Sequence, residues 1–95
     1  HKDIIHEILK IIIDKGKGLE VNTSGIRYGL GHFNPQIPIL KMYLDMGGEI
    51  ITIGSDAHSK DQVGYLWEEA ANMLSNIGFK HFTTFENRKP QFHKL

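Results

Sequence analysis

One short apolar segment constrains the fold of this chain more than any other feature of its sequence. The segment Glu49–Ser55 (EIITIGS) carries Ile50, Ile51 and Ile53 around one threonine, so a strand here is apolar on both faces. Such strands are typical of parallel sheets, which helices cover on both sides. We therefore expect an α/β architecture in which this strand is buried.

Helical and strand patterns alternate along the rest of the chain. Apolar residues at helical spacing predict three helices: Asp3 to about Lys15, Pro35–Pro38 to Met46, and Ser59 to Ile77. Two more strands are predicted at Leu19–Asn22 and Phe79–Phe85. The expected helix stops are Gly16 with Gly18, Gly47 with Gly48, and Gly78. A polar turn (Glu86–Pro90) with a short tail is expected to end the chain. The order is α-β-α-β-α-β, which favours parallel strands.

The chain is short for such an architecture. It has 95 residues, and three parallel strands do not cover both their faces and their edges without further elements. The opening helix also follows no strand. We expect residues 1–95 to be the C-terminal three β/α units of a larger barrel or sheet, within one domain and without an internal boundary. An intact small three-layer α/β domain is the alternative.

Composition limits the cellular environments and the classes of partner that we expect for this chain. The 11 Lys and Arg residues balance the 11 Asp and Glu residues, so the net charge is 0 at pH 7 with neutral histidines. This balance provides no electrostatic attraction for nucleic acid or an anionic membrane. Cysteine is absent, which excludes disulfides and thiolate metal sites. With no long apolar run, we expect a cytoplasmic protein without membrane or nucleic-acid partners.

The sharpest candidate site follows the apolar strand, at Gly54-Ser55-Asp56-Ala57-His58. Asp56 and His58 are two residues apart, so both side chains point to one side of an extended strand end. A carboxylate and an imidazole placed in this way are able to bind a divalent metal. The alternative is that Asp56 caps the next helix, although Ser59 already provides a cap. Gly54 allows the backbone to approach another group closely.

A second candidate lies in the long loop Thr23–Asn34. Arg27 follows Glu20-Val21-Asn22-Thr23-Ser24-Gly25, in which Glu20 and Asn22 share one face of the strand. Arginine beside hydroxyls and loop N–H groups is suited to phosphate, which guanidinium binds bidentately. A solvated surface arginine is the ordinary alternative. His32, Arg88 and Lys89 also lie on predicted loops, and the sequence leaves their roles open.

These two motifs resemble a known family. The stretches LEVNTSGIR (Leu19–Arg27) and EIITIGSDAH (Glu49–His58) are similar to the PHP superfamily of metallophosphoesterases, and within it to the histidinol-phosphatases. The resemblance runs over nearly the whole chain. It implies a distorted (β/α)7 barrel with a trinuclear centre of zinc, iron or manganese. By the same resemblance, Asp56 and His58 ligate metal, and Arg27 contacts the phosphate of a small phosphomonoester.

The resemblance also implies an activity, and this chain lacks some of the residues on which that activity depends. Histidinol-phosphatases hydrolyse L-histidinol phosphate to L-histidinol and phosphate, a step of histidine biosynthesis. The family's other metal ligands belong to earlier strands, which this chain does not contain. We therefore expect the chain to be inactive without the missing N-terminal part of the barrel. The alternatives are another PHP phosphoesterase, or a non-catalytic remnant that serves as a structural or interaction module.

Overall fold

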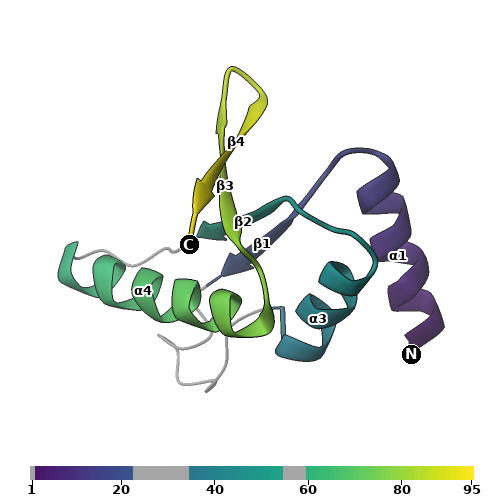
Figure 1. The fold of residues 1–95 in the computed structure, drawn as a ribbon, viewed down its shortest axis with the longest axis horizontal. Coiled ribbons are helices and arrows are strands. Elements are labelled where there is room, and N and C mark those ends of the chain that lie inside the picture. Colours follow the sequence, from purple (N-terminus) through teal and green to yellow (C-terminus); the bar gives the residue numbers. More distant parts are fainter. Residues whose placement is uncertain (1, 23–34, 55–59) are drawn as a thin grey trace.

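A computed structural model of the chain describes residues 2–22, 35–54 and 60–95 (Figure 1). In chain order the elements are α1 (Lys2–Asp14), β1 (Leu19–Asn22), α3 (Ile37–Asp45), β2 (Ile51–Gly54), α4 (Lys60–Ile77), β3 (His81–Glu86) and β4 (Lys89–Lys94). The three helices and three strands expected from the sequence are therefore present, with small shifts at their ends. The predicted Ser59 cap of α4 lies outside the described residues.

The helices end as their glycines predict. In each of them two backbone N–H groups beyond the last turn bond back to helix carbonyls, which is the Schellman arrangement. In α4, the N–H of Phe79 donates to Leu74 O at 3.0 Å, and that of Gly78 donates to Ser75 O at 3.1 Å. Gly78 has φ +127°, a conformation that L side chains rarely adopt. None of the described helices is both long and apolar enough to cross a membrane.

Strands β1 and β2 form a parallel two-stranded sheet, in register from Leu19↔Ile51 to Asn22↔Gly54. Alternation along the strands gives this sheet one apolar face, on which Val21 and Ile51 are completely buried. The other face carries Glu20, Asn22, Thr52 and Gly54, so it is polar. The expectation of a strand that is apolar on both faces is thus met on one face only.

The core lies between the apolar face of this sheet and the three described helices. Its buried side chains come from every helix and from both parallel strands: Leu9, Val21, Leu40, Tyr43, Ile51, Ala70, Leu74 and Phe79. Tyr43 spans the distance from α3 to the sheet, and its hydroxyl donates a hydrogen bond of 2.7 Å to Ile50 O. Burial raises the pKa of this phenol, and the negative charge of Glu49 adds to the rise.

The C-terminal part of the chain departs from the prediction. Residues 89–94, expected to be a turn and tail, form β4, which pairs antiparallel with β3. The two residues that connect them, Asn87 and Arg88, have φ of 52° and 66°, as a two-residue type I′ hairpin requires. Figure 1 shows this hairpin projecting from the rest of the molecule.

The hairpin also changes the sheet. Among the described residues β3 pairs only with β4, so the molecule has one parallel and one antiparallel sheet rather than three parallel strands. β3 still lies against β2, where the backbone N–H of Ile51 donates to Thr83 Oγ1 at 3.3 Å. A side-chain hydroxyl, rather than a backbone carbonyl, therefore satisfies this donor. The described fold is a small α/β domain.

Candidate functional site

Both motif-bearing segments leave the parallel sheet at the same edge. Asn22 and Gly54 are register partners at the carboxyl ends of β1 and β2. From Asn22 the chain continues into residues 23–34, which include Arg27 and His32, and from Gly54 into residues 55–59, which include Asp56 and His58. These four side chains lie outside the described residues. The structure brings together the two strand ends from which they follow, at the edge where parallel α/β folds place their sites.

Glu20 is the described side chain that defines this edge most clearly. A Cβ added at Gly54 would lie 2.7 Å from Glu20 Oε1 and 2.8 Å from its Cδ. Such distances are far below van der Waals contact, so the carboxylate occupies the space that a side chain at position 54 would need. The close approach expected at Gly54 is confirmed, and the approaching group is Glu20.

The sequence places Glu20 and Asn22 on one face of the strand, and the resemblance implies that Glu20 is not a metal ligand. The signal that identifies it is the register, because Glu20 is the partner of Thr52, one strand alternation before Gly54. Its carboxylate has no hydrogen bond or ion pair with any other described residue. In the described part of the chain, no three His, Asp or Glu side chains are grouped closely enough to hold a metal. Of the acidic side chains there, Glu20 lies against the end of β2 that leads into residues 55–59.

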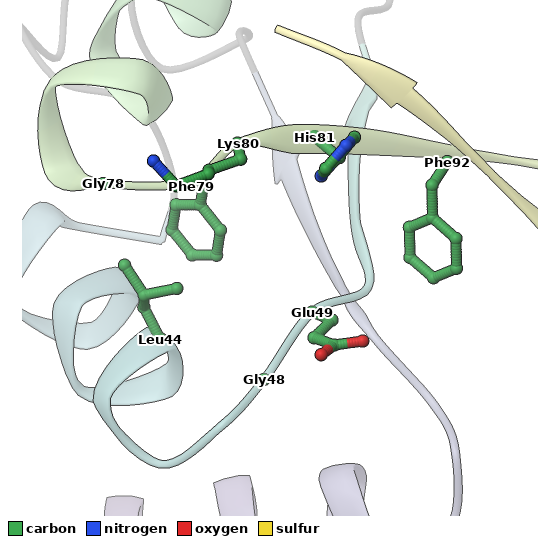
Figure 2. Close-up of a pocket in the computed structure, with 8 residues that line it drawn as sticks. All are labelled: Leu44, Gly48, Glu49, Gly78, Phe79, Lys80, His81 and Phe92. Atoms are coloured by element: carbon green, nitrogen blue, oxygen red, sulfur yellow. The ribbon is translucent and has the colours of Figure 1, made fainter.

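A cavity lies at the opposite end of the strands. It has a volume of ≈540 Å³ and is lined by residues that precede or begin β2 and β3, with one residue each from α3 and β4: Leu44, Gly48, Glu49, Gly78, Phe79, Lys80, His81 and Phe92. Figure 2 shows Phe79 and Leu44 on one side of it and Phe92 on the other, with Glu49 facing the space below His81. Because active sites of parallel α/β folds lie at the carboxyl ends of strands, we do not assign the reaction to this cavity.

Three further polar residues, His93, Arg88 and Lys89, lie on the β3–β4 hairpin. His93, expected in a tail, lies on β4, where its ring stacks on Phe82 with centroids 5.0 Å apart. Its Nε2 is 2.7 Å from Thr84 Oγ1. Arg88 is exposed in the turn between β3 and β4, and Lys89 is the exposed first residue of β4.

The chain is similar in sequence to proteins that are named histidinol-phosphatase or probable histidinol-phosphatase. The chain is 38% identical over 81 residues to a probable histidinol-phosphatase of Thermotoga maritima, a match that covers 85% of this chain and 34% of the relative. It is also 38% identical over 80 residues to a probable histidinol-phosphatase of Clostridium acetobutylicum, covering 84% of this chain and 31% of that protein.

A third relative, the histidinol-phosphatase of Lactococcus lactis, is 27% identical over 94 residues, with 94% of this chain and 33% of the relative covered. The chain thus spans about a third of the length of the curated relatives it matches. No family model matches the chain. No solved structure matches it either.

Proposed function

We propose that this chain carries the metal- and phosphate-binding part of a metal-dependent phosphomonoester hydrolase that acts on L-histidinol phosphate. The observation that carries the proposal is the match to proteins named histidinol-phosphatase over 85% of the chain. A match of 81 residues within 95 necessarily includes residues 19–58, and hence both motifs. The common strand edge from which the two motifs follow supports their acting together.

In this proposal Asp56 and His58 hold divalent metal, and Arg27 binds the substrate phosphate. Carboxylate and imidazole ligands suit zinc, iron and manganese. When bound, such a metal supplies Lewis-acid stabilisation and a nucleophile at neutral pH. The Arg27 guanidinium orients the phosphate bidentately and offsets the negative charge that spreads over its oxygens during in-line displacement.

The proposal includes further polypeptide, since a trinuclear centre needs more ligands than this chain provides. Two surfaces of the described structure support such a partner, the amino-terminal part of a barrel. On α1 the side chains of Ile4, Ile8 and Ile11 are 65%, 51% and 52% exposed, and their spacing places them on one face. Among the described strands, β1 pairs only with β2, so its other edge is available to a further strand.

A chimera tests the proposed activity directly. The segment of the Thermotoga maritima relative that matches this chain is replaced by the chain, and phosphate release from L-histidinol phosphate is measured. We expect the chimera to fold and to hydrolyse this substrate only with divalent metal present. A folded chimera that hydrolyses other phosphomonoesters instead indicates a different phosphoesterase. One that hydrolyses none indicates a non-catalytic module.

Asp56→Asn in the chimera tests the metal site. The substitution keeps the shape of the side chain but removes the charge that binds the cation, so we expect turnover to fall by about 100-fold or more. Folding is checked by circular dichroism. Glu49→Gln, a carboxylate at the opposite end of β2, is the matched control and is expected to leave turnover unchanged. Unchanged turnover in Asp56→Asn would remove this residue from the metal centre.

Arg27→Ala in the chimera tests the phosphate site. Loss of a charge-assisted contact to the phosphoryl group is expected to cost roughly 2–4 kcal/mol of transition-state stabilisation, which is measured as a lower kcat/KM. Arg27→Lys keeps the charge without the bidentate geometry, so it should recover only part of the loss. If both variants behave like the parent chimera in steady-state kinetics, the phosphate binds elsewhere.

A further inference from the structure

We infer that the face of the β3–β4 hairpin that carries Phe85 and Phe92 binds single-stranded nucleic acid. Two bases stack on these rings, and phosphates lie beside Arg88 and Lys94. The inference does not depend on the proposed function, and it concerns a surface to which neither the motifs nor the relatives' names assign a role. Three observations on described residues carry it: two exposed rings on one face, a separation of charge along the chain, and an edge strand unsuited to peptide pairing.

The two faces of the hairpin differ in what covers them. On one face Phe82 contacts Trp67 of α4 edge to face, with ring centroids 5.1 Å apart. Because cross-strand partners share a face and successive residues alternate, Phe85 and Phe92 lie together on the other face. This second face touches β2 at Thr83, which is 2% exposed, whereas Phe85 is 53% and Phe92 47% exposed. The hairpin therefore presents two aromatic rings beyond its contact with β2, on a projecting ribbon (Figure 1).

The spacing of the two rings suits neighbouring bases. Phe85 pairs with Pro90, two residues before Phe92, so the rings are diagonal neighbours of an antiparallel pair. Diagonal neighbours are roughly 7–8 Å apart, a separation that aromatic side chains bridge, so the two rings form one surface. Every base has a flat π-face, and aromatic side chains on which successive bases stack are the common element of single-strand binding surfaces.

Charge is distributed unevenly along the chain. Residues 80–95 contain four Lys or Arg and one Glu, a net charge of +3, whereas residues 1–79 contain seven Lys or Arg and ten Asp or Glu, a net charge of −3. The neutral balance of the whole chain therefore does not describe the hairpin, which attracts anions. Its one acid, Glu86, is the register partner of Lys89, so these two charges offset each other and the other three cations remain.

Two of the remaining cations lie at the ends of the ring pair. Lys94 follows Phe92 by two residues and shares its face, and Arg88 lies in the turn beyond Phe85. Both are exposed. Arg88 has φ 66° at the second position of the type I′ turn, where glycine is the usual residue. Phosphates on either side of two stacked bases would thus each meet a cation, and the guanidinium is suited to bind one bidentately.

A peptide strand added along β4 is the other partner that this hairpin offers, and the sequence of β4 disfavours it. Among the described strands, β4 pairs only with β3, so its outer edge is open. Pro90 has no N–H to donate to a ladder, and Lys89 and Lys94 begin and end the strand. Proline and lysine are the residues that protect edge strands from further pairing. Recognition by side chains on the face is therefore favoured over backbone pairing at the edge.

The test is a titration of this chain into a fluorescein-labelled oligothymidylate of about ten nucleotides, a length within the usual site sizes, followed by fluorescence anisotropy. We expect a Kd of about 10⁻⁴–10⁻⁵ M at 50 mM salt, typical of sequence-independent binding. If Lys80, Arg88 and Lys94 each neutralise a phosphate, the affinity should fall about 20-fold between 50 and 200 mM salt. No change in anisotropy at chain concentrations up to about 1 mM would overturn the inference.

Variants at position 85 separate base stacking from apolar contact. Phe85→Ala and Phe85→Leu should each weaken binding about tenfold, whereas Phe85→Tyr keeps the ring and should stay within about twofold of the wild type. Circular dichroism checks folding, and Phe85 is exposed, so little loss of stability is expected. If Phe85→Leu binds like the wild type, the ring does not stack on a base and the inference is wrong.

Variants of the cations test the proposed phosphate contacts. Arg88→Gln should weaken binding about threefold and make the salt dependence less steep, since one phosphate contact is lost. Lys41→Gln, an exposed cation on α3, is the matched control and should change the affinity less than about twofold. Equal weakening by Arg88→Gln and Lys41→Gln would show attraction to the chain as a whole, which contradicts a site on the hairpin.

Competition distinguishes nucleic acid from other polyanions. An oligoglutamate of the same length carries the charge without the bases, so it should compete at least about tenfold less well than unlabelled oligothymidylate. Equal competition would indicate an acidic peptide as the partner and overturn the inference. The chimera described above should bind the oligonucleotide as well. A folded chimera that does not bind it would show that further polypeptide covers this face, which also overturns the inference.

Discussion

Tyr43 has a buried hydroxyl whose environment favours the protonated form. The residue is 1% exposed, and the phenol donates to Ile50 O, a carbonyl that also accepts the N–H of Leu19. The hydroxyl therefore links α3 by a hydrogen bond to Ile50, the residue that precedes β2. A phenolate in the same place would lose its donor and lie near the negative charge of Glu49, which contributes to the raised pKa.

Tyr43→Phe is expected to lower the free energy of unfolding by about 1 kcal/mol at pH 7, the usual contribution of one hydrogen bond. The pKa of Tyr43 is raised in the folded state, so the stability that it contributes is complete below the unfolded pKa of about 10. This contribution is lost as the pH rises through the folded pKa. Urea denaturation between pH 7 and pH 11 should therefore show the gap between wild type and variant narrowing on the alkaline side. A gap that stays constant with pH would contradict this account.

A side-chain hydroxyl connects the two sheets by a hydrogen bond. Thr83 is 2% exposed, and its Oγ1 accepts the backbone N–H of Ile51, itself completely buried on β2. The hairpin is thereby joined to the parallel sheet without a ladder of backbone hydrogen bonds. Loss of this acceptor leaves a buried N–H without a partner, which costs more than the hydrogen bond itself contributes.

Thr83→Val replaces the hydroxyl by a methyl group of similar size, so we expect a loss of about 1–3 kcal/mol in the free energy of unfolding. Thr84→Val on the same strand is the matched control. It loses an exposed hydrogen bond to His93 and should cost less than about 1 kcal/mol. Both are measured by urea denaturation, and equal losses in the two variants would show that the Ile51 donor finds another partner.

The elements differ in how well their sequences predict them. The helices are predictable because apolar spacing and a glycine stop are local properties, and each stop forms the expected Schellman bonds. β4 was missed because its segment KPQFHK contains a proline and little apolar alternation, and its turn has no glycine at either positive-φ position. Its pairing partner compensates for weak local preference, which a sequence pattern does not reveal.

At the scale of the whole molecule, α1 presents apolar side chains on two sides. Leu9 is buried in the core, whereas Ile4, Ile8 and Ile11 face outward. A helix that is apolar on both sides is typical of one packed between two layers. This outward stripe is the surface that the proposed further polypeptide would cover.

Substituting the outward stripe together (Ile4→Lys, Ile8→Glu and Ile11→Lys) tests whether it packs within this chain. Because these side chains are exposed, we expect the free energy of unfolding to change by about 0.5 kcal/mol or less per position. Leu9→Ala, on the buried side, should cost about 2–4 kcal/mol. Urea denaturation measures both variants. Unfolding of the triple variant would show that the stripe belongs to the internal core.

The chain by itself determined the type and order of its elements up to β3, and it determined which residues carry the candidate chemistry. Both are matters of local pattern, namely periodicity, glycine stops and the Asp56-x-His58 spacing. Only the tertiary structure decided that β3 pairs with β4, that Asn22 and Gly54 end side by side, and that Glu20 occupies the space over Gly54. Register and pairing depend on contacts between residues far apart in the chain. The energy of such a contact depends on both segments together, so the local pattern of one segment does not reveal it.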